Sequence, residues 1–479
     1  MNTLRKALAL SLALLLGGCL VGPNYHRPPV ATPPQYKELA GWTVAVPAAD
    51  QPKGDWWTAF NDPLLDELEP MVSVSNQTVR QDYANYQQAL AEVQVARSAL
   101  FPIIGISGGV TRQRAASGSN VPGASGVVNS GSLEGNVSWA PDLWGAVRRN
   151  IEASKATAQA SAATLANATL SEQTALATAV IELRVTDANI DLLQRTVAAF
   201  TEFLRVVSNQ GTAGTTPPSD VITARTQLEN TQSSLIALGV ARAQDVHAIA
   251  VLVGKNPEDL DIDRGTQVPA LPTLPVGVPS TLLQRRPDIA IAERQMAAAN
   301  AAIGVAEAAY YPTLTLSAAD GFSQSPLAGL LHAANNIWSL GADATENLFQ
   351  GGLTRAQVAA AKAAYDASVA NYRSTVLKAL QNVEDDLAGL RILAEQSEVL
   401  DSAVRDATRG SEIAFNEYRA GTVDYTTAAT AQATQLSIEE TALSVKLQRL
   451  LDTVSLMGDV GGGWSAEELQ NPGKPAAAR

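Results

Sequence analysis

Residues 101–114, FPIIGISGGVTRQR, and residues 311–324, YPTLTLSAADGFSQ, share one layout and lie 210 residues apart. Each opens with an aromatic residue and a proline, after which apolar side chains alternate with glycine or small polar ones. A period of two is typical of a strand with one apolar and one polar face. Residues 132–144 and 336–349 follow the same pattern. We therefore expect two pairs of strands, one in each half of the chain.

Long stretches without helix breakers follow each pair of strands. Residues 146–210 contain neither glycine nor proline, and residues 327–471 contain no proline. Because these residues punctuate secondary structure most strongly, the gaps predict long helices, from about 145 to 208 and from about 352 to 418. Apolar residues also recur at steps of three and four, as in a coiled coil. They are Leu183, Ile190, Leu193, Val197, Phe200, Leu204 and Val207, and later Leu436, Leu443, Leu450 and Met457.

The ends of the long helices supply a second landmark. Gly211-Thr212 and Gly421-Thr422 also lie 210 residues apart, and we expect the two glycines to turn the chain into return helices. A repeat this long indicates a duplicated half rather than a solenoid.

The division of the chain follows from these landmarks. We expect a signal peptide at 1–18, a lipidated proline-rich segment at 19–70, a first repeat at 71–255, a linker at 256–286, a second repeat at 287–458 and a flexible tail at 459–479.

The N-terminus reads as a secretory signal. Arg5 and Lys6 precede an apolar run, and Gly17-Gly18-Cys19 follows it. A basic start, a short apolar segment and small residues before the cut are typical of such a signal. Its end resembles a bacterial lipobox, which implies a covalent lipid on Cys19. The alternative is a buried structural cysteine after an ordinary signal.

Composition excludes several classes of function. The 479-residue chain carries a net charge of -13, which argues against nucleic-acid binding through a basic surface. One cysteine and three scattered histidines argue against a Cys/His metal site, and we expect no cofactor. After the signal we find no stretch of about 18 apolar residues, so we expect no transmembrane helix. Membrane crossing would then require a barrel, and four strands need three copies to close one.

Five short motifs carry a family resemblance: CLVGPNYHRP (19–28), DWW (55–57), LLQRRPDI (282–289), AAYYPTLTL (308–316) and YRAGTVDY (418–425). The chain resembles the TolC-like outer membrane factors of tripartite efflux systems, in the lipoprotein branch with OprM and the NodT-type channels. The resemblance implies a mainly α fold with a transmembrane β-barrel. In it, a homotrimer forms a 12-strand barrel continued by a helical coiled-coil tunnel.

Function and partners follow from the resemblance. It implies a lipid-anchored exit duct in the cell outer membrane with a long periplasmic extension, which passes drugs or other small molecules. A periplasmic adaptor protein and an inner-membrane RND-type pump would be its partners. Because substrate passes through such a duct unchanged, we expect that the protein is not an enzyme. An exit duct for type I protein secretion is the alternative within this class.

The resemblance also implies a periplasmic gate at the second helix turn. In relatives, a tyrosine three residues before the turn glycine bonds an aspartate of the first half, here Tyr418 and Asp220. The alternative for Asp220 is a simple helix cap. An arginine that completes this contact in some relatives is replaced by Val423, and Arg419 could substitute for it.

The constriction itself departs from the family pattern. Relatives often carry aspartates six and nine residues after the turn glycine, where this chain has Thr427 and Thr430. Asp424 and Tyr425 lie near the turn and complete the predicted gate.

Two other motifs have competing interpretations. GISGG (105–109) matches the serine-hydrolase elbow and would make Ser107 a nucleophile in a lipid-anchored hydrolase, but a strand-like segment rather than a helix follows it. RRPDIAIAE (285–293) could bind a charged ligand. We favour a helix start, with Pro287 in the first turn, Asp288 favourable to the helix dipole, and the arginines paired with nearby carboxylates.

Overall fold

The computed structural model describes residues 20–38, 55–114, 127–265, 267–272, 285–464 and 466. The predicted signal peptide, Cys19 and most of the predicted tail lie outside the described residues. The elements, in chain order, are η1 (Trp56–Phe60), α2 (Pro63–Ser75), α3 (Gln77–Ser98), β1 (Ile103–Arg114), β2 (Val127–Trp139), α4 (Ala146–Thr212), α5 (Pro218–Leu252), η2 (Pro257–Asp259), α7 (Pro287–Ala308), β3 (Thr313–Gln324), η4 (Ala333–Asn335), β4 (Asn336–Thr345), α8 (Leu353–Arg419) and α9 (Tyr425–Asp459).

The chain forms two compact units, and each takes segments from both sequence halves. Unit 1 comprises Met1–Pro29, Tyr86–Ala160 and Ala292–Tyr372. Unit 2 comprises Val30–Asn85, Ser161–Ile291 and Arg373–Arg479.

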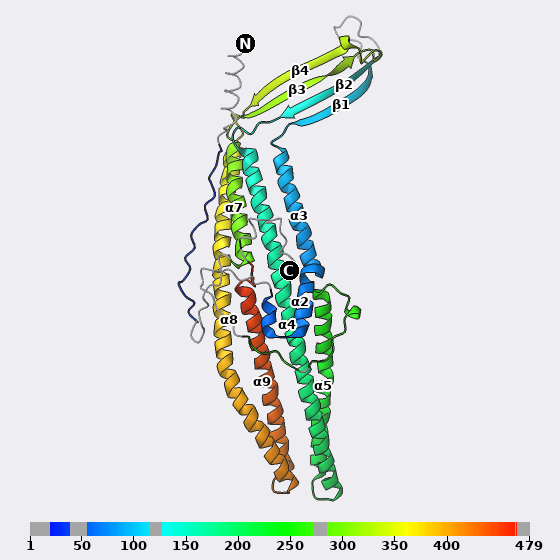
Figure 1. Ribbon diagram of the computed structural model, residues 1–479, viewed down its shortest axis with the longest axis vertical. Helices are drawn as coiled ribbons and strands as arrows, with labels where there is room; N and C mark the ends of the chain where they lie inside the picture. Colours follow the sequence, from blue (N-terminus) through cyan, green and yellow to red (C-terminus); the bar gives the residue numbers. More distant parts are fainter. Residues whose placement is uncertain are drawn as a thin grey trace. The chain divides into compact units, whose positions relative to one another are not determined.

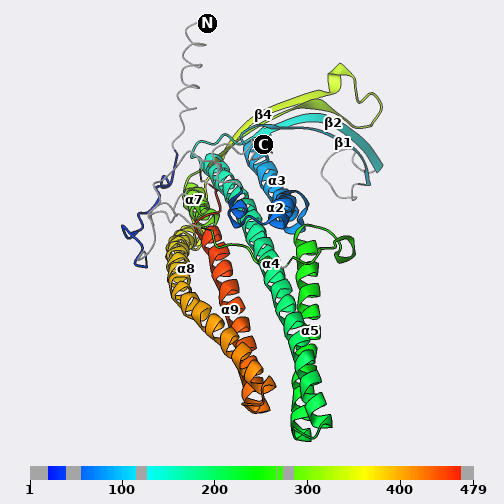
Figure 2. The same cartoon turned by 60° about the horizontal axis from the view of Figure 1, so that its bottom comes forward.

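The strands of unit 1 form a single antiparallel sheet in the order β1-β2-β3-β4. The curved sheet is visible in both views (Figures 1 and 2). The central pair joins the two sequence halves, with Gly135 opposite Asp320. Gly321 is required there, because a Cβ would lie 2.3 Å from the carbonyl oxygen of Leu133. All four predicted strands are confirmed, although β2 begins five residues earlier than expected.

The faces of the sheet are unequal. On β1, alternate positions bring Ile104, Ile106 and Val110 to one face, and all three are exposed. The other face carries Ser107 and Thr111, together with glycines at 105 and 109 and one apolar side chain, Ile103. Every residue of β4 is exposed. One copy of the chain therefore leaves an apolar sheet face uncovered.

An N-terminal strap, residues 20–27, binds the helices of unit 1 through Arg149. This side chain is only 2% exposed. Its guanidinium donates to the carbonyl oxygens of Val21 and Gly22, at 3.0 and 2.9 Å, and to the side chain of Asn24 at 3.0 Å. Gly22 has a φ of 90°, and a Cβ there would lie 2.4 Å from Gly304 of α7. The motif VGPNY (21–25) thus packs the N-terminal strap against α4 and α7.

Unit 2 is built from long helices that pair side by side, α4 with α5 and α8 with α9 (Figures 1 and 2). α4 and α8 have 67 residues each, and α5 and α9 have 35 each. The core lies where α2 packs on the middle of α4 and on the ends of α5 and α9. Trp57 of the DWW motif is buried in this core, together with Leu65, Leu183, Ile249 and Leu450.

The RRPDI motif (285–289) lies at the start of helix α7, as predicted. Pro287 is the first residue of α7. Arg286 pairs with both oxygens of Asp288, at 3.0 and 2.8 Å, and with Asp459 at 2.7 Å. Because Arg286 is largely buried, these charge-assisted bonds satisfy a guanidinium that water does not reach well.

The duplication is confirmed, but its offset changes within the chain. α3 and α7 begin 210 residues apart, as do β1 and β3. α4 and α8, and then α5 and α9, begin 207 residues apart. β2 has 13 residues whereas β4 has 10, which accounts for the difference.

Among the residues that the structure describes, one helix is long and apolar enough to cross a membrane, by length and composition only. It is α5, whose most apolar window is 17% buried. Our expectation that no such stretch exists is therefore wrong by this measure. Ile222, Ile236 and Val240 are among its exposed side chains.

Glu69 is a buried acid without a partner. It is 0% exposed on α2, and neither carboxyl oxygen has a hydrogen-bond partner among the described residues. Burial in these apolar surroundings raises the pKa of Glu69 to about 9. The folded protein therefore holds a proton there that the unfolded chain releases near pH 4.3.

This proton makes stability depend on pH. Since the folded-state pKa is raised, the contribution is most favourable in acid and falls as pH rises from about 4.3 towards about 9. Glu69→Gln, which cannot ionise, should raise stability at pH 7.5 by about 4 kcal/mol. Thermal unfolding in detergent at pH 4.5 and 7.5 checks this. A gain of equal size at both pH values would contradict it.

Candidate functional site

Two helix turns form one end of unit 2, and their backbones match. In the turn from α4 to α5, the amide of Thr215 donates to the carbonyl oxygen of Gln210 at 2.9 Å. In the turn from α8 to α9, the amide of Thr422 donates to Glu417 at 3.0 Å. Both bonds belong to the six-residue closure that ends a helix when one residue adopts a left-handed conformation.

The left-handed residues are Gly214 and Gly421, with φ of 70° and 75°. Gly421 thus lies at its turn, as expected, whereas the prediction for Gly211 is wrong. Gly211 lies inside α4, where a Cβ would approach Val221 of α5 to 3.0 Å. It permits close packing of the helices. The matching words are Ala-Gly-Thr at 213–215 and at 420–422, which are 207 residues apart.

An aromatic cluster holds the two turns together. The ring of Phe203 stacks on Tyr425 at 5.3 Å and contacts Tyr418 and Phe415, each at 5.4 Å. Phe203, Tyr418 and Tyr425 are all buried. Such ring pairs contribute about 0.5–1.5 kcal/mol each beyond their burial. The cluster ties α4 of the first half to α8 and α9 of the second.

Tyr418 reaches the first half, but its partner differs from the predicted one. Its hydroxyl donates a short hydrogen bond to Oε1 of Gln210, not to Asp220. Burial raises the pKa of Tyr418, and the charge of Asp220 adds to the effect. Asp220 therefore lies close enough for its charge to act on the Tyr418 hydroxyl, but it makes no hydrogen bond to that hydroxyl. The predicted Tyr418–Asp220 hydrogen bond is wrong for this structure.

The alternative role for Asp220, a helix cap, is wrong as well. Pro217 occupies the cap position of α5, and in the described part of the chain no side chain makes a capping hydrogen bond to that helix. Asp220 lies in the first turn, where its charge suits the helix dipole. Its carboxylate accepts a hydrogen bond from the hydroxyl of Thr216 at 2.9 Å. Burial, together with Asp220 and Tyr418, raises the pKa of Tyr425 to about 12.

Asp424 is the residue that caps a helix here. Its Oδ1 accepts from the backbone amide of Thr427 at 2.8 Å and from the Thr427 hydroxyl at 2.6 Å. These two bonds, the hydroxyl first, lower the pKa of Asp424. The predicted gate residues Asp424 and Thr427 are thus joined in one N-cap, which fixes the start of α9.

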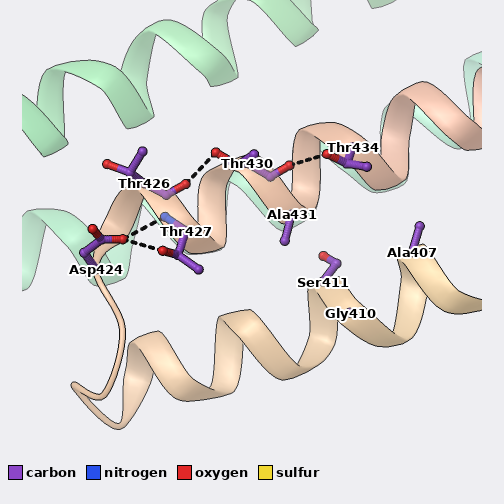
Figure 3. Close-up of a pocket in the computed structure, with 9 residues that line it drawn as sticks. All are labelled: Ala407, Gly410, Ser411, Asp424, Thr426, Thr427, Thr430, Ala431 and Thr434. Carbon is purple, nitrogen blue, oxygen red and sulfur yellow. Dashed lines mark hydrogen bonds between the residues drawn. The ribbon is translucent and has the colours of Figure 1, made fainter.

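An open groove of 540 Å³ runs between α8 and α9 beside this cap (Figure 3). Ala407, Gly410 and Ser411 line it from α8, and Thr427, Thr430, Ala431 and Thr434 line it from α9. The hydroxyl of Thr430 donates to the carbonyl oxygen of Thr426 at 2.7 Å, and Thr434 donates to Thr430 at 2.8 Å. Because these protons are used within the helix, the hydroxyls offer only acceptor oxygens to the groove.

Sequence reasoning missed Phe203, Gln210 and Thr216. Phe203 lies one residue outside the predicted stripe that contains Leu204, and its bulk beside Phe200 was the available indication. No sequence feature identified Gln210. Arg419 does not replace the missing arginine, since its guanidinium lies over the ring of Phe415, 6.0 Å from the centroid. In the described part of the chain, no group of three or more His, Cys, Asp or Glu residues could hold a metal ion.

The sheet, the duplicated long helices and the matched turns define the TolC-like class of outer-membrane channel subunits. The family model described as outer membrane efflux protein matches residues 71–255 and 278–462. The chain belongs to this family of outer-membrane efflux channels.

Individual relatives agree over nearly the full length. The toluene efflux pump outer membrane protein TtgF of Pseudomonas putida is 30% identical over 464 residues, covering 95% of this chain and 96% of that protein. Nodulation protein T of Rhizobium leguminosarum bv. trifolii is 28% identical over 471 residues, covering 95% and 96%. The solved structure of the outer-membrane channel OprN is similar with a TM-score of 0.87 and 28% identity, covering 93% of this chain and 100% of that one.

The Tyr418–Gln210 bond can be tested by removing one hydroxyl. Tyr418→Phe keeps the ring in the cluster and should weaken the closed turns by about 1 kcal/mol, the usual value of one hydrogen bond. Amide hydrogen exchange should then be about five-fold faster in residues 210–220 and 415–425. Tyr425→Phe is the matched control, since the Tyr425 hydroxyl has no hydrogen bond within the described residues. Equal effects of the two variants would show that ring packing alone holds the turns.

Proposed function

We propose that three copies of this efflux channel form a trimeric exit duct for small molecules. One observation carries the proposal: within the described residues, β1 and β4 each pair on one side only, so the sheet has two open edges. In a membrane, unpaired backbone groups are too costly to persist, and a closed barrel of 12 strands from three copies satisfies them. The relatives named for toluene and antibiotic efflux support small apolar compounds as substrates.

The helix-turn end is proposed as the periplasmic gate. Asp220, Tyr418, Asp424, Tyr425, Thr427 and Thr430 gather there, and the turn glycines are Gly214 and Gly421. Threonine oxygens at positions 427 and 430 carry no charge. A threefold constriction built from them would select less for cations than one built from aspartates.

We propose that a periplasmic adaptor protein contacts this end and links it to an inner-membrane RND-type pump. The groove between α8 and α9 supports this, because small side chains leave it open along the helices. Helices approach each other most closely where such residues line the contact. A helix of the adaptor is the occupant we propose.

Two further proposals concern the chemistry of the chain. Lipid on Cys19 would add a membrane anchor beside the barrel. The protein is proposed to be no enzyme, because Ser107 of the GISGG motif lies inside β1, opposite Glu134, rather than in a strand-to-helix turn.

Conductance across a planar bilayer tests the duct and its gate. The purified protein should form channels whose current is insensitive to millimolar divalent cations. Thr427→Asp with Thr430→Asp should introduce block by Mg²⁺, because three copies would bring six carboxylates together. Thr422→Asp, on the exposed turn, is the control and should introduce no block. Absence of any channel would refute the duct, and unblocked current in the double variant would refute this placement of the gate.

The adaptor contact is tested by filling the groove. A Cβ at Gly410 meets nothing within 4 Å, so Gly410→Phe should fold normally while its ring occupies the groove. Binding of the cognate adaptor and export of antibiotics should fall at least ten-fold, with conductance unchanged. Gly410→Ala, which leaves the groove open, is the control. Normal adaptor binding by Gly410→Phe would place the contact elsewhere.

A further inference from the structure

A second cleft, of 430 Å³, lies in unit 1 beside the N-terminal strap. It follows the first four turns of α4, and Tyr25 of the strap and Arg294 of α7 line its other side. The hydroxyl of Tyr25 donates to Glu293, and the guanidinium of Arg294 lies 5.9 Å from the centre of the Tyr25 ring. The cleft is thus assembled from three segments that are far apart in sequence.

The cleft carries excess positive charge in an acidic protein. Arg148, Lys155 and Arg294 line it, against one carboxylate, Glu152. Arg148 is paired with Asp142 at 3.1 Å, and Arg294 is paired with Glu293. Glu152 already accepts from Arg149 at 2.7 Å. In the part of the chain that the structure describes, these three pairs leave the exposed ammonium of Lys155 unneutralised.

Comparison of the two halves shows that this free charge is specific to the first. Lys155 is the tenth residue of α4, and Lys362 is the tenth residue of α8. Lys362 pairs with Glu307 of α7 at 3.0 Å. The residue of α3 that corresponds to Glu307 is Arg97. The first half therefore has no acid at the position of Glu307, the residue that neutralises Lys362 in the second half.

Aromatic side chains place the mouth of the cleft at the membrane surface. Trp144 stacks on Tyr311 at 4.8 Å where the strands end and the helices begin, and Phe101 and Tyr310 are exposed at the same junction. Belts of this kind mark the boundary between hydrocarbon and headgroups. Arg148 lies within one turn of the start of α4, and Lys155 lies about 10 Å further along the helix. Its long side chain can extend back toward the headgroups.

We propose that this cleft binds the headgroup phosphate of an anionic glycerophospholipid from the periplasmic leaflet of the outer membrane. Lys155 supplies the unpaired charge, while Arg148 and Arg294 remain held by their carboxylates and provide further N–H donors. A headgroup with net negative charge is favoured over a zwitterionic one, since the cleft carries one cation more than its local acids neutralise. The site depends on the outer-membrane location and not on the gate or the adaptor.

Native mass spectrometry of the full-length protein tests the site. The protein is equilibrated in detergent with equal amounts of phosphatidylglycerol and phosphatidylethanolamine, and retained lipid is counted. We expect preferential retention of phosphatidylglycerol. Lys155→Ala should weaken it about five-fold, the effect of one lysine near an anionic surface, and Lys155→Arg should restore it.

Lys362→Ala is the matched control, because it removes the corresponding lysine of the second half, and it should leave retention unchanged. Equal losses in Lys155→Ala and Lys362→Ala, or no loss in either, would overturn the proposal. Inorganic phosphate is tested alone as a competitor. Displacement of phosphatidylglycerol by phosphate as effectively as by the lipid itself would show a site for free phosphate and overturn the lipid assignment.

Discussion

Backbone hydrogen bonding is the constraint on which the rest of this protein depends. Within the described residues, an antiparallel sheet of four strands satisfies its inner strands and leaves one side of β1 and one side of β4 open. Such edges are tolerated in water, where short or charged strands protect them, but not in hydrocarbon. Both faces of β1 and β4 are also exposed in the single copy. The folded chain is therefore an incomplete structure, which the proposed association of three copies would complete.

The same incompleteness appears in the helices. α5 has the composition of a membrane span, yet only 17% of its apolar window is buried in the single copy. Hydropathy counts side chains and does not distinguish a lipid neighbour from a protein neighbour. In a family whose barrel crosses the membrane, exposed Ile222, Ile236 and Val240 fit a surface that a second helix covers.

Sequence predicted the elements well because glycine and proline spacing and hydrophobic periodicity are local properties. The long helices, the four strands and the duplication all follow from them. The site was predicted less well, because it depends on register. Shortening of β4 relative to β2 shifts the repeat by three residues, and this shift misassigned the turn to Gly211 instead of Gly214. The partner of Tyr418 depends on how α4 lies against α8. A pattern within one helix contains no information about that.

The duplication explains how a symmetric fold obtains an asymmetric end. The two turns share their backbone hydrogen bonds, but at equivalent positions the side chains have diverged: Gly211 corresponds to Tyr418, Pro217 to Asp424, and Asp220 to Thr427. A tyrosine in both halves would clash where α4 and α5 approach closely, since even a Cβ at Gly211 would lie 3.0 Å from Val221. The small residue in one half and the large one in the other are thus a single packing solution. This packing lets the hydroxyl of Tyr418 in the second half reach Gln210 in the first half. The hydrogen bond that holds the halves together thus takes one partner from each.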